Sequence, residues 1–225
     1  MKRLLILSGI AACASSQAFM IDDFSTGSFA QSITAGSWIG SQLGSMYGGE
    51  RDSGMLVQAN PLNQFMDMSV QSGLVITSSG ALLDGQSGVE YDGVGDETDN
   101  VAPFERGPGL NANFSASADR FRLNFLANDL PMSVLAYVYT YGSPDALSTS
   151  TVAVGANQNS FSVDIPFSSF AGGASFSDVD RFGFIFETGP SGDFALESIE
   201  AVPEPATMAA IGAGIVGLIA RRRRK

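Results

Sequence analysis

The sequence predicts an all-β fold, a two-sheet β-sandwich of jelly-roll type, between two short terminal segments of different character. Glycine and serine are spread throughout the chain, with 26 glycines among 225 residues, and short apolar alternations lie between them. Such alternation is typical of strands that bury one face and end at frequent turns. Between residues 19 and 203 no window of helical period is as long as an ordinary globular helix. About ten to twelve short strands are expected, which is the pattern of a sandwich.

The clearest strand patterns lie in the second half of the chain. Residues 121–125 and 182–186 place phenylalanine or leucine at every second position, as a strand with one buried face requires. Residues 132–141 are the longest uninterrupted strand candidate, and both of its faces are apolar. Two apolar faces indicate either a central strand covered on both sides or a strand with an exposed aromatic row. The tyrosines that share one of these faces are Tyr137, Tyr139 and Tyr141.

Two further strands are expected at residues 149–154 and 161–165, with residues 155–159 as a hairpin loop between them. In a jelly roll the terminal strands lie near each other. Residues 19–24 are therefore expected beside residues 194–199, so that the C-terminal segment would leave from one end of the sandwich.

The amino-acid composition excludes several kinds of chemistry. The chain has no histidine and one cysteine, Cys13. Ser-His and Cys-His catalysis and a zinc site with histidine or cysteine ligands are therefore impossible, and carboxylate chemistry alone remains. Between residues 19 and 203 there are five arginines, no lysine and 22 acidic residues, a net charge of −17. Such a surface repels nucleic acid, so no nucleic-acid partner is expected.

The first 18 residues have the layout of a secretory signal peptide. A basic start precedes an apolar stretch over residues 4–14, and small residues follow it. We expect cleavage after Ala18 and a mature N-terminus at Phe19, which leaves a domain without cysteine. The alternative is a lipidated N-terminus at Cys13, because the residues that end there resemble a loose lipobox.

The last 24 residues describe a segment that enters a membrane. Pro203, Glu204 and Pro205 form a rigid turn, an uncharged apolar run covers residues 206–220, and five cations end the chain at residues 221–225. A helix over the apolar run would be roughly 22 Å long, shorter than a hydrocarbon core of about 30 Å, and the long basic side chains recover part of the difference. The basic end is expected to stay cytoplasmic, with the folded domain on the other side.

This three-part tail, with its Pro203-Glu204-Pro205 motif, resembles a PEP-CTERM sorting signal. The resemblance implies export, an inner-membrane intermediate held by the tail helix, and processing near the motif by an exosortase-like protease. The product would lie at the cell surface or outside the cell. The chain is thereby divided into a signal peptide (1–18), a β-sandwich domain (19–201) and a sorting tail (202–225).

Short motifs of the domain resemble carbohydrate-binding modules with a jelly-roll fold. They are Ile21-Asp22-Asp23-Phe24, Gly48-Gly49-Glu50-Arg51-Asp52 and the segment 176–180. This resemblance implies a glycan ligand. Arg51, which stands between two acidic residues, is expected either to form an ion pair that fixes a turn or to contact sugar hydroxyls.

An acidic stretch that begins at Glu90 is the candidate metal site. Close carboxylates repel one another unless a cation or a raised pKa relieves them, and Ca²⁺, which takes roughly six to eight oxygen ligands, suits an exported protein. The candidate ligands are Asp92, Asp96 and Asp99. The spacing matches no EF-hand, and the alternative is a solvated acidic loop.

Four aromatic residues are candidate glycan contacts, because aromatic faces stack on sugar rings. They are Trp38, the single tryptophan, and Tyr137, Tyr139 and Tyr141. The alternative for these residues is ordinary packing in the core of the sandwich.

The tail and the domain together favour an exported, surface-associated protein with a structural or adhesive role, linked to the extracellular polysaccharide matrix. A carbohydrate-binding module with a defined glycan ligand is the first alternative. A glycan-active enzyme that uses two carboxylates is the second, and no catalytic residue is assigned to it.

Overall fold

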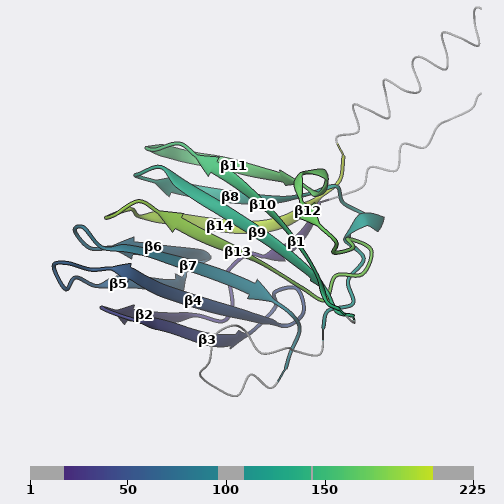
Figure 1. Cartoon of the computed structure of the whole chain (residues 1–225), viewed down its shortest axis with the longest axis horizontal. Helices are drawn as coiled ribbons and strands as arrows, with labels where there is room; N and C mark the ends of the chain where they lie inside the picture. The colour runs from purple at the N-terminus through teal and green to yellow at the C-terminus, as the bar shows by residue number, and fades with distance from the viewer. Residues whose placement is uncertain (1–17, 96–108, 143, 205–225) are drawn as a thin grey trace, which may run out of the picture.

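The computed structural model describes residues 18–95, 109–142 and 144–204, which form two seven-stranded antiparallel sheets packed face to face (Figure 1). Sheet A contains, in spatial order, β11 (Gln158–Pro166), β8 (Arg120–Asn128), β14 (Phe194–Val202), β6 (Leu74–Ser79), β5 (Met66–Gln71) and β2 (Phe29–Ile33), with β1 (Phe19–Asp22) paired to β14. Sheet B contains β12 (Ala171–Gly172), β10 (Ala146–Val154), β9 (Met132–Thr140), β13 (Arg181–Thr188), β7 (Asp84–Tyr91), β4 (Glu50–Ala59) and β3 (Ser37–Leu43).

The predicted two-sheet sandwich is confirmed, with more strands than the sequence pattern suggests. The described part of the chain has fourteen strands, and its helices are two short 3₁₀ turns, Phe114–Ala116 and Phe167–Ser169. The additional strands are the ones without a clear alternation, such as the two-residue strand β12, which pairs with β10. Pairing with a neighbour, rather than an apolar pattern of its own, makes such a segment a strand.

The core is built from phenylalanines that the two sheets point toward each other. On β8, Phe121 lies with its ring centroid 5.3 Å from that of Phe182 and 5.5 Å from that of Phe184, both on β13. One layer away, the centroids of Phe125 and Phe186 are 6.1 Å apart. These five rings belong to the two alternations that the sequence shows most clearly, and each buried ring contributes about 1.5–3 kcal/mol to folding.

The two ends of the domain lie side by side, as predicted. Strand β1 pairs antiparallel with the last residues of β14, with Phe19 opposite Ala201 and Met20 opposite Glu200. Figure 1 shows both chain ends of the sandwich at the same side of the molecule. Residues 1–17 of the expected signal peptide, Cys13 among them, lie outside the described residues, as do Pro205 and the expected tail helix over 206–220. Within the described ranges, the structure contains no helix long and apolar enough to span a membrane.

The hairpin predicted over residues 155–159 is wrong. Strands β10 and β11 are joined by this loop, but β10 belongs to sheet B and β11 to sheet A. The side chain of Asn128 on β8 holds the crossing: its amide donates to Gly155 O at 2.7 Å, and Gln158 N donates to its oxygen at 3.1 Å. A short loop between two strands does not reveal that a third strand directs the chain to the other sheet.

Candidate functional site

The outer face of sheet B, which points away from sheet A, carries the side chains of the candidate site. The strand register puts Tyr137 of β9, Gly183 of β13, Glu90 of β7 and Asp52 of β4 in one row across the sheet. Alternate residues of the same strands, such as Phe184, are fully buried in the core. The row therefore joins a tyrosine, a glycine and two carboxyl groups on one surface.

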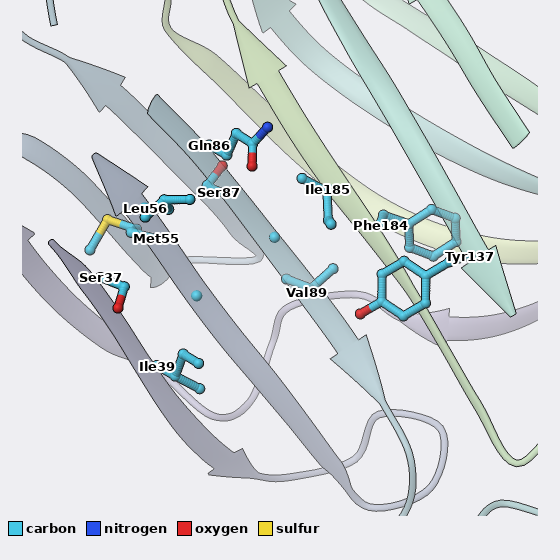
Figure 2. Close-up of a pocket in the computed structure, with 12 residues that line it drawn as sticks. Ser37, Ile39, Met55, Leu56, Gln86, Ser87, Val89, Tyr137, Phe184 and Ile185 are labelled. Carbon is cyan, nitrogen blue, oxygen red and sulfur yellow. The ribbon is translucent and has the colours of Figure 1, made fainter. Parts of the chain in front are cut away.

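A groove of about 260 Å³ lies on this face, next to that row (Figure 2). Its floor is Gly54 of β4 and Gly88 of β7, which are paired in register. On either side of the floor stand Ile185 of β13 and Ile39 of β3, which belong to the same register row. Two neighbouring glycines in central strands leave a trough where side chains would otherwise fill the surface.

The remaining lining of the groove is apolar with a few polar groups. Leu56, Gln86 and Ser37 occupy the next register row and lie toward one end, while Tyr137 lies toward the other (Figure 2). Ile39 and Leu56 are about 40% exposed, so the apolar surface is open to solvent rather than closed over. Open apolar surface beside a small number of polar groups is the usual composition of a ligand site.

Gly183 explains how Tyr137 reaches across the sheet. A Cβ at position 183 would lie 2.6 Å from Tyr137 Cζ, so the tyrosine ring occupies the space that any other residue would need. The ring crosses β13, and its hydroxyl donates a hydrogen bond to Glu90 Oε2. Tyr137 is only 7% exposed, although it belongs to the outer face.

Burial controls the titration of this corner of the site. It raises the pKa of Glu90 to about 8, against the opposing effects of Arg181, whose Nε lies 3.6 Å from Glu90 Oε2, and of the Tyr137 hydroxyl. Burial also raises the pKa of Tyr137 well above its ordinary value, with the charge of Glu90 as the second cause. The Arg181 guanidinium carbon lies 4.1 Å from the ring centroid of Tyr139, a cation–π contact. A carboxyl group with a raised pKa therefore lies next to the Tyr137 end of the groove.

Three carboxyl groups gather beyond this end of the groove. One oxygen from each of Asp52, Glu90 and Asp92 lies within 4.8 Å of the others, and all three residues are buried. Asp92 is one of the ligands expected from the sequence, whereas Asp96 and Asp99 lie outside the described residues. Glu90 belongs to the same acidic stretch, but Asp52 is 38 positions earlier, and only the pairing of β4 with β7 brings it here.

The aromatic candidates are divided between the two faces of sheet B. Tyr137 and Tyr139 lie on the outer face, with ring centroids 6.2 Å apart. Tyr141 follows β9, and its backbone N–H donates to Asp180 Oδ2 at 2.6 Å. Trp38 points inward from β3 and packs on Phe29 of sheet A, with 5.2 Å between ring centroids. The structure therefore brings Tyr137 to the groove and places Trp38 in the core region.

Sequence reasoning missed the three glycines of the site. In the sequence, nothing next to Gly54, Gly88 or Gly183 distinguishes them from the other glycines of this glycine-rich chain. Each stands inside a strand, at an outward position, on three neighbouring strands. Glycine in a strand interior weakens the strand and marks a place where another group approaches closely, so this pattern was the available signal.

The expected processing residues lie together at one end of the sandwich. Ala18 is exposed and directly precedes β1, in which Phe19 is the first residue. Pro203 is half-buried and Glu204 exposed, and both directly follow β14. Pro205 lies outside the described residues.

The fold and the groove define this protein as a β-sandwich with one hollowed sheet face. The family model of the PEP-CTERM protein-sorting motif matches residues 201–225, so the chain carries this motif at its C-terminal end, as the tail pattern predicts. The motif indicates a protein that is exported and sorted to the cell surface. No curated protein matches the chain.

Solved structures of carbohydrate-binding modules are similar to the domain. The family 11 carbohydrate-binding module from Clostridium thermocellum, in complex with a β-1,3-1,4-mixed-linked tetrasaccharide, is 14% identical, with 83% of this chain and 95% of that chain covered and a TM-score of 0.43. The solution structure of CtCBM11 is 15% identical over 86% of this chain and 99% of that chain, with the same TM-score of 0.43.

Proposed function

We propose that this protein is an exported, surface-associated adhesive protein whose sandwich domain binds a glycan chain of the extracellular matrix in the groove of sheet B. The observation that carries the proposal is the floor made by Gly54 and Gly88, with apolar walls on both sides and hydrogen-bonding groups at the ends. A sugar ring has the matching character, because its C–H faces are apolar and its hydroxyls lie around its edge.

The size of the groove fits a short segment of such a chain. Sites for drug-sized ligands measure roughly 300–1,000 Å³, and the groove, at about 260 Å³, lies just below that range. The floor would take the flat face of the sugar, and Ser37 and Gln86 would meet its hydroxyls at one end. At the other end the Tyr137 ring forms the wall. The affinity of one such short site is expected to be modest, and a matrix of repeated sugars compensates by offering many sites.

Filling the floor of the groove tests this proposal. A Cβ at Gly54 would lie 3.5 Å from Trp38 O, an ordinary contact, so Gly54→Val is tolerated by the sheet while it raises the floor. We expect Gly54→Val to weaken binding to the extracellular polysaccharide at least tenfold in a pull-down or on a glycan array. Gly189→Ala is the matched control, because a Cβ there meets nothing within 4 Å. A folded Gly54→Val protein that binds polysaccharide like the unchanged chain would refute the glycan groove.

The same protein variants and polysaccharide distinguish the proposed glycan binding from two other roles. A matrix protein without a defined ligand would show no saturable binding to any glycan, and Gly54→Val would change nothing. A carboxylate-based enzyme would shorten the polysaccharide with time, which size-exclusion chromatography of the glycan detects.

We further propose that the chain is processed at both ends. The tail helix over 206–220 would hold an inner-membrane intermediate until an exosortase-like protease cuts near Pro203-Glu204-Pro205 and releases the domain to the cell surface. The matched sorting motif supports this, and so does the position of Pro203 directly after β14, where the folded domain ends. Mass spectrometry of the C-terminus, from cells with and without the processing protease, tests it: an intact tail in both would contradict it.

At the other end, cleavage after Ala18 is supported by the start of β1 at the next residue. The Phe19 ring stacks on Phe114 with a centroid distance of 5.7 Å, so the residue that would follow the cleavage site is packed in the domain. The intact mass of the exported protein separates the alternatives: cleavage gives Phe19 as the first residue, whereas lipidation would leave a modified Cys13.

A further inference from the structure

The carboxyl groups of Asp52, Glu90 and Asp92 meet on the outer face of sheet B because of strand pairing and strand alternation. Asp52 and Glu90 are direct partners in the β4–β7 pairing, and Asp92 is the next outward residue beyond Glu90. Alternation along a strand returns every second side chain to the same face. One oxygen from each group lies within 4.8 Å of the others, and none of the three residues is more than 4% exposed.

A second observation concerns the two oxygens of Glu90. Oε2 accepts the hydrogen bond from the Tyr137 hydroxyl and faces Arg181 Nε at 3.6 Å. Oε1 is buried as well and accepts no hydrogen bond from any residue in the ranges that the structure describes. A buried polar atom without a partner costs about 1–3 kcal/mol, and more when it belongs to a charged group. Glu90 thus presents one oxygen that has no hydrogen-bond donor among the described residues.

From these observations we propose that Asp52, Glu90 and Asp92 form a calcium-binding site beyond the Tyr137 end of the groove. Oxygens that bind one Ca²⁺ lie about 2.3–2.6 Å from it and therefore no more than about 5 Å from one another. The 4.8 Å spread of the three carboxyl oxygens already meets this condition. Mg²⁺ demands near-ideal octahedral geometry and gives up its bound water reluctantly, so three buried carboxyl groups favour the larger ion.

The strand ends that carry the ligands are held close to each other. Gly48 and Gly93, both at positive φ, approach so closely that a Cβ at Gly48 would lie 3.3 Å from Gly93 Cα. Glu50 Oε2 accepts a hydrogen bond from Gly95 N at 3.1 Å across the same gap. These contacts join the start of β4 and the residues just before it to the segment after β7. The carboxyl groups are therefore positioned before an ion binds, which lowers the cost of binding.

The ion would lie on the same face as the groove but does not depend on a glycan. Tyr137 links the two, because its ring lines the groove and its hydroxyl orients Glu90. An ion on Glu90 Oε1 would therefore fix this wall of the groove. The calcium proposal is tested by metal binding alone, and the glycan proposal is tested by polysaccharide binding alone. Failure of one proposal can therefore be told apart from failure of the other.

Calorimetric titration of the purified full-length chain with CaCl₂, in buffer freed of divalent ions, tests the site. We expect saturable binding of one ion with a dissociation constant on the order of 10⁻⁴–10⁻³ M, the range of extracellular calcium modules. MgCl₂ should bind at least tenfold more weakly. The absence of calcium binding up to about 10 mM would overturn the proposal.

Substitutions of the carboxyl groups test whether these residues bind the calcium ion. Glu90→Gln, which keeps the shape of the side chain, should weaken calcium binding at least tenfold, and Asp92→Asn should do the same. Asp84→Asn is the matched control, because Asp84 lies on the same strand, six positions before Glu90, outside the carboxyl cluster. Should Glu90→Gln not fold, Asp92→Asn decides. Calcium binding that survives in the folded variant, or that is lost equally in Asp84→Asn, would overturn the assignment.

Discussion

Arg51 Nη1 donates a 2.7 Å hydrogen bond to Asp22 Oδ2, and both side chains are buried. The pair joins β4 of sheet B to β1 of sheet A across the interior. Asp22 Oδ2 also accepts from the Tyr91 hydroxyl at 3.0 Å, and Arg51 Nη2 donates to Gly27 O at 2.7 Å. Arg51 is therefore a structural ion pair, as one of the two sequence interpretations holds, but its partner is Asp22 rather than an adjacent acid. The polar network fixes the N-terminal strand on the sandwich.

Removing one member of this pair should strongly destabilise the domain. Asp22→Ala leaves the guanidinium of Arg51 buried without its carboxylate, and breaking a buried pair in this way costs about 3–5 kcal/mol. The free energy of unfolding in urea measures the loss. Asp23→Ala is the control, because Asp23 is exposed and bonds to Ser25, and its loss should stay near 0.5–1 kcal/mol. Equal losses in the two variants would contradict a special role for the buried pair.

The raised pKa of Glu90 predicts that the free energy of unfolding falls as pH rises. Burial raises the pKa of Glu90 from 4.5 in the unfolded chain to about 8 in the folded protein. The folded state therefore binds the Glu90 proton more tightly than the unfolded chain does. This contribution is complete below pH 4.5 and is lost as pH rises through 8. In buffer with a chelator, the free energy of unfolding should decrease with pH in this window by up to about 1.4 kcal/mol per unit. Glu90→Gln should flatten the slope, and an unchanged slope would exclude Glu90 as its source.

The lowered pKa of Asp164 predicts that the free energy of unfolding rises with pH in the acidic range. The hydrogen bonds from Arg122, at 2.7 and 2.9 Å, lower the pKa of Asp164 below its ordinary 3.8. The stability that this pairing contributes is present above pH 3.8 and is lost as pH falls through the lower folded value. Because the carboxyl is 32% exposed, the effect should be no more than about 1 kcal/mol. Urea unfolding of the unchanged chain and of Asp164→Asn should differ at pH 6 and converge near pH 2.

The sequence predicts those parts of the fold that depend on local alternation. The phenylalanine rows of β8 and β13 face the core as expected, because a strand that buries one face must alternate. Pairing between β1 and β14 also follows, since the two-sheet architecture constrains where the ends meet. The crossing from β10 to β11 does not follow, because the Asn128 side chain that directs it comes from a strand remote in the sequence.

The candidate site could be predicted only in part, for the same reason. Tyr137 stands out in an aromatic row and does line the groove. Asp52 and Glu90 belong to different motifs, and no local pattern reveals that β4 and β7 pair at these residues. The groove itself is made by absent side chains at Gly54 and Gly88, and an absence leaves no hydrophobic signal in the sequence.

The position of the Tyr137 ring depends on Gly183, which gives a last test of the site. A Cβ at position 183 would lie 2.6 Å from Tyr137 Cζ and 2.7 Å from Val89 O, so either the tyrosine ring or the strand must move. Gly183→Ala should therefore push the ring off β13, separate its hydroxyl from Glu90 and cost about 1–3 kcal/mol of unfolding free energy. Gly189→Ala, which meets nothing, should cost less than about 0.5 kcal/mol. If the Tyr137 ring holds Glu90 in place, Gly183→Ala should also weaken calcium binding in the titration described above. Unchanged stability and calcium affinity in Gly183→Ala would show that the ring does not depend on this glycine.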